Sequence, residues 1–288
     1  MMLNAEYASW RDPTLNSELT ESSHLVSSAD CSSATGAFYC ATMRVVRLGV
    51  LVPSSNTAAE PLTYAIVSSI QSKDVSISVH FSRFRVTTID ISSEANAQFE
   101  MLPILIAARL LADAKVDVIG WSGTSAGWLG FDHDQKLCAA IEAETGIKAT
   151  TSVLSLNSIL RSLGVISFGL VTPYRKELND LIRDNYAAIG VDINATWDRH
   201  LGLTDNNDIA NVDDATLDRM VMDVASNGAN VLSTFCTNLR AAQRVEYWEQ
   251  SSSVIVLDTV ASVVWGMLKI VGVDTRLVKG WGYMFEVE

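Results

Sequence analysis

Cysteine and histidine are scarce in this sequence, and their spacing offers no recognisable metal site. Each of the two occurs four times among 288 residues. Neither set forms the paired, closely spaced pattern that zinc ligands follow, so we expect no metal. A long chain with few cysteines also suits a reducing compartment, which predicts a cytoplasmic location.

Basic residues and long uncharged apolar runs are lacking too. Lys and Arg number 21 against 33 Asp and Glu, which gives a net charge of −12, so no nucleic-acid partner is expected. The most apolar segment, residues 102–121, is interrupted by four charged residues and is typical of a helix that runs into a strand. We therefore expect no membrane partner. A homo-oligomer is compatible with the sequence.

Residues 1–43 differ from the rest of the chain. They hold eight serines, one Arg and no Lys. A secretory signal needs a basic start and an apolar centre, and transit peptides are rich in Arg, so neither is indicated. We predict a flexible N-terminal extension, with partial packing on the body as the alternative.

Apolar residues, in contrast, are abundant at 48%, and from residue 44 onward strand and helix patterns alternate. Short apolar runs are typical of buried strands, and segments with helical spacing separate them. This alternation predicts an α/β protein with parallel sheets flanked by helices. We expect strands at 45–52, 75–81, 116–120, 148–151, 165–171, 191–197, 230–235 and 254–257, and helices that include 95–114, 134–144 and 240–249. The P-loop, HExxH and GxGxxG motifs are absent.

The two halves of the chain repeat one order of motifs. A strand, the turn PSSNT and a helix correspond to a later strand, the turn TPY and a helix; strand–SGTSA then corresponds to strand–FCTNL. We predict two similar lobes that face each other, residues 44–163 plus 264–288 and residues 164–263. Ligands bind at the carboxyl ends of parallel strands, where these turns lie.

Cys236 is the first candidate for chemistry. It follows an apolar strand, next to Thr237 and Asn238, at a predicted helix start. Backbone N–H groups there can tune a thiol or bind a carboxylate. The alternative is an inert buried cysteine. The other cysteines lack this setting and are interpreted as structural or incidental: Cys31, Cys40 and Cys138.

The other turns supply polar groups at predicted strand ends. The Gly-Thr-Ser turn at 123–125 can form an oxyanion or carboxylate cradle, or simply a tight turn with a cap. The Ser-Ser-Asn turn at 54–56 is an N-cap in its simplest interpretation. A tyrosine at a strand end packs, or donates its hydroxyl to a carboxylate. The candidate binding residues are Ser54, Ser55, Asn56, Gly123, Thr124, Ser125, Tyr174, Thr237 and Asn238.

Two other groups near the predicted cleft are open to two interpretations. Asp132, His133 and Asp134 could form an acid–base group, but acids are favoured at a helix start, and we interpret all three as surface residues. Three aromatic residues can line a pocket or belong to the core: Trp121, Trp128 and Phe235.

Together, the segments GVLVPSSNTAAEP, GTSAGWLG, TPY and STFCTNLR resemble the aspartate/glutamate racemase superfamily, nearest to its branch of maleate cis-trans isomerases and arylmalonate decarboxylases. The resemblance covers residues 44–285. It implies two pseudo-symmetric Rossmann-like lobes, each a mainly parallel four-stranded sheet flanked by helices. It also implies an active site in the cleft between them and no cofactor.

The resemblance implies roles for individual residues. Racemases and maleate isomerases of this superfamily use two cysteines, one from each lobe, whereas arylmalonate decarboxylases keep only the second. This chain has Gly123 where the first thiol would stand, which implies that Cys236 is the single catalytic thiol. Thr124, Ser125 and Tyr174 would bind a carboxylate or enediolate. The turn with Asn56 is instead similar to that of the maleate isomerases, in which the Asn contacts a substrate carboxylate.

These observations favour a cofactor-independent lyase that decarboxylates a small malonate-type dicarboxylate. A two-base racemase needs groups on opposite faces of one carbon, whereas decarboxylation needs only protonated Cys236. One alternative is a maleate cis-trans isomerase or related racemase-type isomerase, in which the thiolate adds to a double bond. Another is a non-catalytic ligand-binding protein. We expect Gly123→Cys to restore two-sided proton exchange.

Overall fold

The computed structural model describes residues 43–288, so the predicted N-terminal extension lies outside the described residues. The first half contains a four-stranded parallel sheet with the order β2-β1-β3-β4. The second half of β1 is buried on both faces, which explains its continuous apolar run. The elements are β1 (Arg44–Pro53), α1 (Ala59–Ser68), β2 (Val75–Phe84), α2 (Ser93–Ala97), α3 (Met101–Asp113), β3 (Val118–Trp121), α4 (Ala126–Leu129), α5 (Phe131–Thr145), β4 (Ala149–Thr151) and α6 (Ser152–Ser162).

The second half repeats this arrangement. Its sheet is also parallel and has the order β6-β5-β7-β8, so each strand takes the place of the strand four numbers earlier. The prediction of two parallel four-stranded sheets flanked by helices is confirmed. The elements are β5 (Ser167–Thr172), α7 (Lys176–Ala188), β6 (Asp192–His200), α8 (Asn206–Ala210), α9 (Asp214–Ser226), β7 (Val231–Thr234), η1 (Ala242–Arg244), α10 (Val245–Ser252), β8 (Ile255–Asp258), α11 (Thr259–Ile270), η2 (Thr275–Leu277) and η3 (Tyr283–Glu286).

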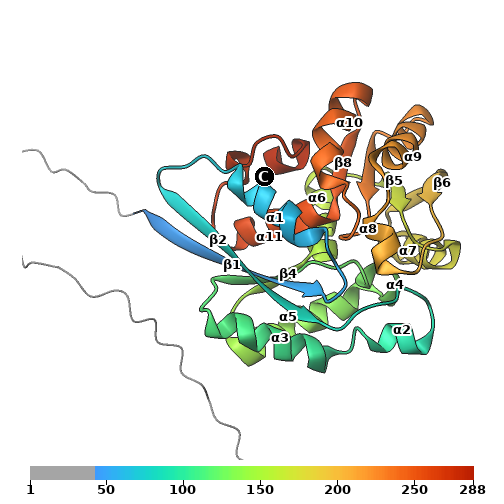
Figure 1. The fold of residues 1–288 in the computed structure, drawn as a ribbon. Helices are drawn as coiled ribbons and strands as arrows, with labels where there is room; N and C mark the ends of the chain where they lie inside the picture. Colours follow the sequence, from blue (N-terminus) through green and yellow to red (C-terminus); the bar gives the residue numbers. More distant parts are fainter. Residues whose placement is uncertain (1–42) are drawn as a thin grey trace, which may run out of the picture. The chain divides into compact units, whose positions relative to one another are not determined.

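Helices cover both faces of the first sheet. Helices α3 and α5 pack together on one face, and α1 and α11 pack together on the other (Figure 1). Helix α11 approaches β3 closely because Gly120 has no side chain: a Cβ there would lie 2.6 Å from the sulfur of Met267. Since α11 directly follows β8 but packs on the first sheet, it ties the two halves together. The lobe boundary expected at 263/264 falls inside α11, and the lobe boundaries stay a prediction.

Two predicted helices differ from the observed elements. Residues 95–114 form α2 and α3 rather than one helix. Pro103 lacks an N–H group and fits only the first turn of a helix, so α3 begins at Met101. Residues 235–241 form a loop after β7, and α10 begins only at Val245. Within residues 43–288, no helix is long and apolar enough to cross a membrane.

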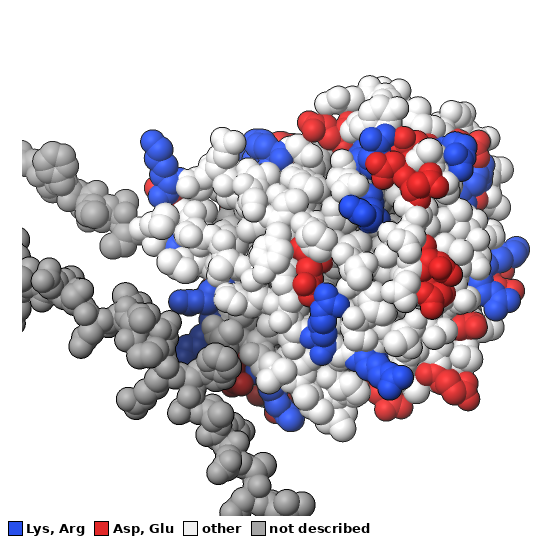
Figure 2. Space-filling model, viewed as in Figure 1, with Lys and Arg blue, Asp and Glu red and all other residues white. Residues whose placement is uncertain are grey.

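Charges of both signs are mixed on the face drawn in Figure 2. Lys and Arg side chains lie beside Asp and Glu side chains. Several form ion pairs, such as Arg83 with Glu60 at 2.7 Å and Arg244 with Asp218 at 2.6 Å. Exposed pairs of this kind contribute at most about 1 kcal/mol each to stability. The expectation that the chain has no nucleic-acid partner stays a prediction.

Candidate active site

Turns at the carboxyl ends of β1, β3, β5 and β7 surround a small cavity. Its volume is about 20 Å³. Because the strands of each sheet are parallel, turns that are far apart in the sequence meet at this edge. The predicted site residues that line the cavity are Asn56, Gly123, Thr124, Ser125, Tyr174, Cys236, Thr237 and Asn238.

Cys236 follows β7, and its side chain is 4% exposed. Its Sγ accepts a hydrogen bond from the N–H of Asn238 at 3.4 Å, and the Tyr174 hydroxyl lies near enough to lower the pKa of the thiol. Burial is the largest effect and raises the pKa of the thiol to about 11, although these contacts lower it. The thiol is therefore protonated at neutral pH.

The prediction that Cys236 lies at a helix start is wrong. Helix α10 begins at Val245, and Cys236 lies in the loop that precedes it. The loop does not continue into a helix because Asn238 bonds across to the first half of the chain instead of capping a helix of its own. A tyrosine hydroxyl and the backbone N–H groups of Asn238 and Leu239, rather than a helix dipole, lower the pKa of the thiol.

Tyr174 connects the thiol to the first half of the chain. Its Oη lies 2.6 Å from Oγ1 of Thr124. Its ring packs edge-on against Trp128, with the ring centroids 5.4 Å apart. Burial raises the pKa of Tyr174, so the phenol stays neutral. Thr124 and Tyr174 are thus hydrogen-bonded to each other near Cys236, and all three residues line the cavity.

Asn56 and Asn238 make reciprocal bonds between the two halves. The Nδ2 of Asn56 donates to the carbonyl of Thr237 at 3.1 Å, and the Oδ1 of Asn238 accepts from the N–H of Thr57 at 3.0 Å. The Oδ1 of Asn56 also accepts from N–H groups at the start of α1, which agrees with a capping role. Both side chains line the cavity, yet their amide groups are already occupied by these bonds.

Ser54 and Ser55 do not line the cavity. Both hydroxyls donate to the carbonyl of Val86, in the segment that follows β2. The hydroxyl of Ser55 also accepts from Nδ2 of Asn206 at 2.9 Å. The predicted contact of these two serines with a ligand is therefore not supported by the geometry, because their hydroxyls hold neighbouring segments in place.

Gly123 lies against the indole of Trp121. A Cβ at position 123 would lie 2.1 Å from Cζ2 and 2.3 Å from Cε2 of that ring. Real Cβ atoms do not approach other heavy atoms so closely. The expected effect of Gly123→Cys therefore needs correction, because a cysteine cannot be accommodated there while Trp121 keeps its position.

Ser125 offers the cavity a hydroxyl that has no hydrogen-bond partner among the described residues. It lies in the sequence GTSAG between β3 and α4, which matches the GxSxG pattern of the nucleophile elbow. A serine nucleophile needs a general base within hydrogen-bond reach. The described residues that line the cavity include no His, Asp or Glu. Ser125 is therefore suited to bind a ligand oxygen rather than to attack a carbonyl.

Sequence reasoning missed four residues of the cavity wall: Pro53, Ile89, Phe99 and Asn206. Ile89 and Phe99 belong to the segment 85–100 between β2 and α3, which reaches the second half, where the N–H of Ile89 donates to the carbonyl of Thr204 at 3.0 Å. Asn206 accepts from Asn238 through its backbone and side-chain oxygens. Connecting segments lack periodicity, so the sequence carries only the weak signal of a capping residue before α8.

The other residues singled out near the cleft have mixed outcomes. Trp121 and Trp128 line the cavity, whereas the ring of Phe235 packs in the core against Tyr186. Asp134 was expected on the surface but is fully buried, and desolvation raises its pKa. It is buried because α5, in whose first turn it lies, packs against α4 and β4.

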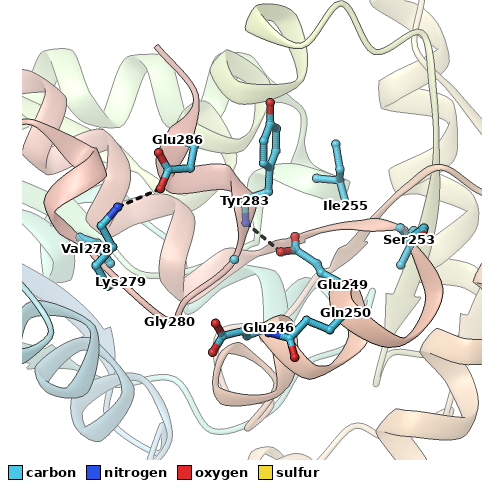
Figure 3. A pocket seen from close by; sticks show the side chains of 12 residues that line it. Glu246, Glu249, Gln250, Ser253, Ile255, Val278, Lys279, Gly280, Tyr283 and Glu286 are labelled. Atoms are coloured by element: carbon cyan, nitrogen blue, oxygen red, sulfur yellow. Dashed lines mark hydrogen bonds and ion pairs between the residues drawn. The ribbon is translucent and has the colours of Figure 1, made fainter.

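A larger hollow of about 570 Å³ lies near α10, β8 and η3. Figure 3 shows that the carboxylates of Glu246, Glu249 and Glu286 surround it. The Nζ of Lys279 is already paired with Glu286 at 3.0 Å. Three carboxylates disfavour a dianionic ligand, and none of the predicted site residues lies here. We therefore assign the chemistry to the small cavity.

Known proteins resemble this chain over most of its length. A family model described as arylmalonate decarboxylase matches residues 81–285. The maleate isomerase of Geobacillus stearothermophilus is 26% identical over 239 residues, which cover 80% of this chain and 93% of that protein. The arylmalonate decarboxylase of Bordetella bronchiseptica is 26% identical over 183 residues, which cover 62% of this chain and 75% of that protein.

The fold is also similar to a solved structure. A crystal structure of a cysteine-to-alanine variant of the maleate isomerase Iso from Pseudomonas putida S16 with maleate aligns with a TM-score of 0.76 and 23% identity. The alignment covers 85% of this chain and 98% of that one. The two-sheet arrangement is therefore shared along nearly the whole of that protein.

Proposed function

Because the chain belongs to the arylmalonate decarboxylase family, we propose that it is a cofactor-independent decarboxylase of a small malonate-type dicarboxylate, with Cys236 as its single catalytic thiol. The asymmetry of the cavity carries this proposal. The second half of the chain supplies Cys236 to the cavity, whereas the first half supplies Gly123, which is covered by the indole of Trp121. One thiol can protonate one face of a carbanion, whereas proton exchange on both faces needs two groups.

The first step breaks a carbon–carbon bond. The carboxylate that stays accepts hydrogen bonds from the Ser125 hydroxyl and from the N–H groups of Thr124 and Ser125, for which the described residues provide no other acceptor. The carboxylate that leaves lies against the apolar side chains of Ile89 and Phe99. Its bond to the α-carbon breaks, CO₂ departs, and the electron pair remains as an enediolate. Fixed donors stabilise this charge as it develops.

The second step is protonation. Cys236 donates its proton to the α-carbon, so a C–H bond forms and the S–H bond breaks. The hydroxyl of Tyr174 donates to the resulting thiolate, and Thr124 donates to Tyr174. A proton from water then restores the thiol. Each turnover takes up one proton and releases one CO₂.

The protonation state of Cys236 supports this direction of proton transfer. Burial raises the pKa of the thiol to about 11, so nearly all of it is protonated at neutral pH without the help of a base. A proton donor needs this state, whereas a nucleophile needs the thiolate. The cavity residues of the described chain supply no acid or base besides Cys236 and Tyr174.

A maleate cis-trans isomerase is the second candidate, favoured by the names of several curated relatives and by the presence of Asn56 in the cavity wall. In that reaction the thiolate of Cys236 adds to the double bond, the resulting single bond rotates, and the thiolate leaves. With the thiol pKa near 11, only about 0.1% of it is ionised near pH 8. A non-catalytic ligand-binding protein remains as the third alternative.

Product analysis separates these functions. The full chain is incubated with phenylmalonate, 2-methyl-2-phenylmalonate, smaller malonates and maleate in D₂O, and the products are followed by NMR. Release of CO₂ with one deuterium on the α-carbon supports the proposal. Formation of fumarate from maleate, without CO₂, supports the isomerase instead. Inertness toward every diacid contradicts both enzymes and favours the ligand-binding protein.

A further inference from the structure

Trp121 belongs to the first sheet and lines the same cavity as Cys236. It is the last residue of β3, and its side chain is 1% exposed. Its ring packs against Phe84, with the ring centroids 4.9 Å apart. On its other side the ring covers Gly123, where any Cβ would lie 2.1 Å from Cζ2. The indole thus packs against both the ring of Phe84 and the backbone of Gly123.

The cavity is too small for a substrate as it stands. Its volume of about 20 Å³ is little more than the roughly 10–15 Å³ that a cavity needs to hold a single water molecule. A diacid must therefore displace part of the wall. Ile89 and Phe99 belong to the connecting segment 85–100, whereas Trp121 belongs to a strand with neighbours on both sides. The wall that yields is then the connecting segment, and Trp121 stays as the fixed limit.

We propose that Trp121 is the specificity-determining residue of this site: its indole takes the space beside Gly123 and limits the α-carbon of the substrate to small substituents. The proposal rests on the proposed function and names its substrate class, small malonates rather than aryl-substituted ones. Replacing the indole by a smaller side chain opens this space. A residue with a side chain can replace Gly123 only when the indole of Trp121 has been replaced as well.

The packing half of the proposal is tested by a double-mutant cycle on the folded full chain. Gly123→Ala adds the single Cβ that clashes, and we expect it to lower the melting temperature by about 5 °C. In the Trp121→Leu background the same change costs little, because the ring is gone. Trp128→Leu is the matched control, since Trp128 lines the same cavity and is not among the atoms nearest to that Cβ. Equal losses in all three backgrounds would overturn the packing argument.

The specificity half is tested with two diacids that differ mainly in size. The two compounds are 2-methyl-2-vinylmalonate and 2-methyl-2-phenylmalonate. Each carries a π system on the α-carbon that delocalises the charge of the enediolate, so the two differ mainly in the size of this substituent. We expect Trp121→Leu to raise the ratio of kcat/KM for the phenyl over the vinyl compound by about 10-fold or more. Trp121→Phe should raise this ratio by a smaller factor, and it replaces Trp121→Leu in the test if the leucine variant does not fold. An unchanged ratio in both variants refutes the assignment.

Binding measured without turnover keeps this test independent of the reaction. Cys236→Ser, alone and combined with Trp121→Leu, is titrated with the same two diacids by calorimetry. A preference for the vinyl compound that disappears with Trp121→Leu supports Trp121 as the size limit, even if no diacid is decarboxylated. If the wild-type protein decarboxylates no diacid but shows this preference in binding, the proposed reaction is wrong and the role of Trp121 as the size limit still holds. Equal affinities in both backgrounds count against Trp121.

Discussion

The hydroxyls of Thr124 and Tyr174 lie 2.6 Å apart and join the turn after β3 to the turn after β5. Thr124 belongs to the first half of the chain and Tyr174 to the second, so this bond crosses the cavity. The Tyr174 hydroxyl also lowers the pKa of Cys236. The position of the Tyr174 hydroxyl, and with it the pKa of the Cys236 thiol, therefore depends on how the two halves are placed. Substitution of Tyr174 tests this dependence directly.

Removal of the Tyr174 hydroxyl should slow turnover and raise the thiol pKa further. Tyr174→Phe loses the donor that stabilises the thiolate, so we expect kcat to fall by about 10- to 100-fold. Tyr186→Phe is the control, because the hydroxyl of this second buried tyrosine has no partner among the described residues. Steady-state kinetics of both variants check the prediction. Equal rates in Tyr174→Phe and wild type would remove Tyr174 from the mechanism.

The pH dependence of turnover distinguishes an acid from a nucleophile. Burial raises the pKa of Cys236 to about 11. A proton donor with this pKa is active below it, so kcat/KM for decarboxylation should be flat through neutral pH and should fall as the pH rises through about 11. A thiolate nucleophile predicts the opposite, about a 10-fold rise per pH unit below the pKa. A rate profile on the wild-type protein decides between them.

The reciprocal bonds of the two asparagines should stabilise the fold. Asn56→Ala removes a bond to Thr237 and the capping of α1, so we expect the free energy of unfolding to fall by about 2–3 kcal/mol. Asn211→Ala is the control, because Asn211 is exposed and should change stability by less than about 0.5 kcal/mol. Urea unfolding of both variants measures the difference. Similar stabilities would show that the Asn56 bonds contribute nothing net.

Asp258 should make the fold less stable as the pH rises through about 6. It is buried at the start of α11, where it accepts from the N–H groups of Val260 and Ala261, and desolvation raises its pKa from 3.8 to about 6. Because the folded state holds the proton more tightly than the unfolded state, stability is greatest below about 4 and is lost as the carboxyl ionises. The shift corresponds to about 3 kcal/mol.

The comparison of Asp258→Asn with Asp213→Asn tests the sign of this effect. The amide keeps the capping oxygen of Asp258 and removes the ionisation, so the part of the stability loss between pH 4 and 7 that Asp258 causes should vanish. Asp213 caps α9 at the surface, and hydrogen bonds from Thr216 lower its pKa. The ionised form of Asp213 therefore stabilises the fold, and this contribution to stability is lost as the pH falls and the carboxylate is protonated. Thermal unfolding across this pH range checks both; an unchanged pH dependence in Asp258→Asn contradicts the assignment.

The fold could be predicted because its signals are local. The apolar run of β1, the Gly-Thr-Ser turn and the Cys-Thr-Asn turn are each made of consecutive residues, and parallel strands bring such turns to one edge. The setting of Cys236 was only partly predictable. Its burial follows from the strand before it, but the Tyr174 hydroxyl that replaces the expected helix start comes from another strand end.

The parts that escaped prediction depend on contacts between distant segments. Ile89 and Phe99 reach the cavity through a connecting segment without periodicity, and Asn206 is held there by Asn238. The close contact of Trp121 with Gly123 joins residues only two positions apart. It still could not be foreseen, because the direction of the indole depends on its packing against Phe84.

The source of the proton on the product is the central claim, and one labelled reaction tests it. Wild type, Cys236→Ser and Cys138→Ser are compared in D₂O with 2-methyl-2-vinylmalonate, and product amount, deuterium content and handedness are measured. Cys138 is also buried but lies outside the cavity, so its variant serves as the control. The account predicts a singly deuterated product of one handedness from wild type and Cys138→Ser, and at least a 100-fold loss in Cys236→Ser. A racemic product, or undiminished turnover by Cys236→Ser, would contradict it.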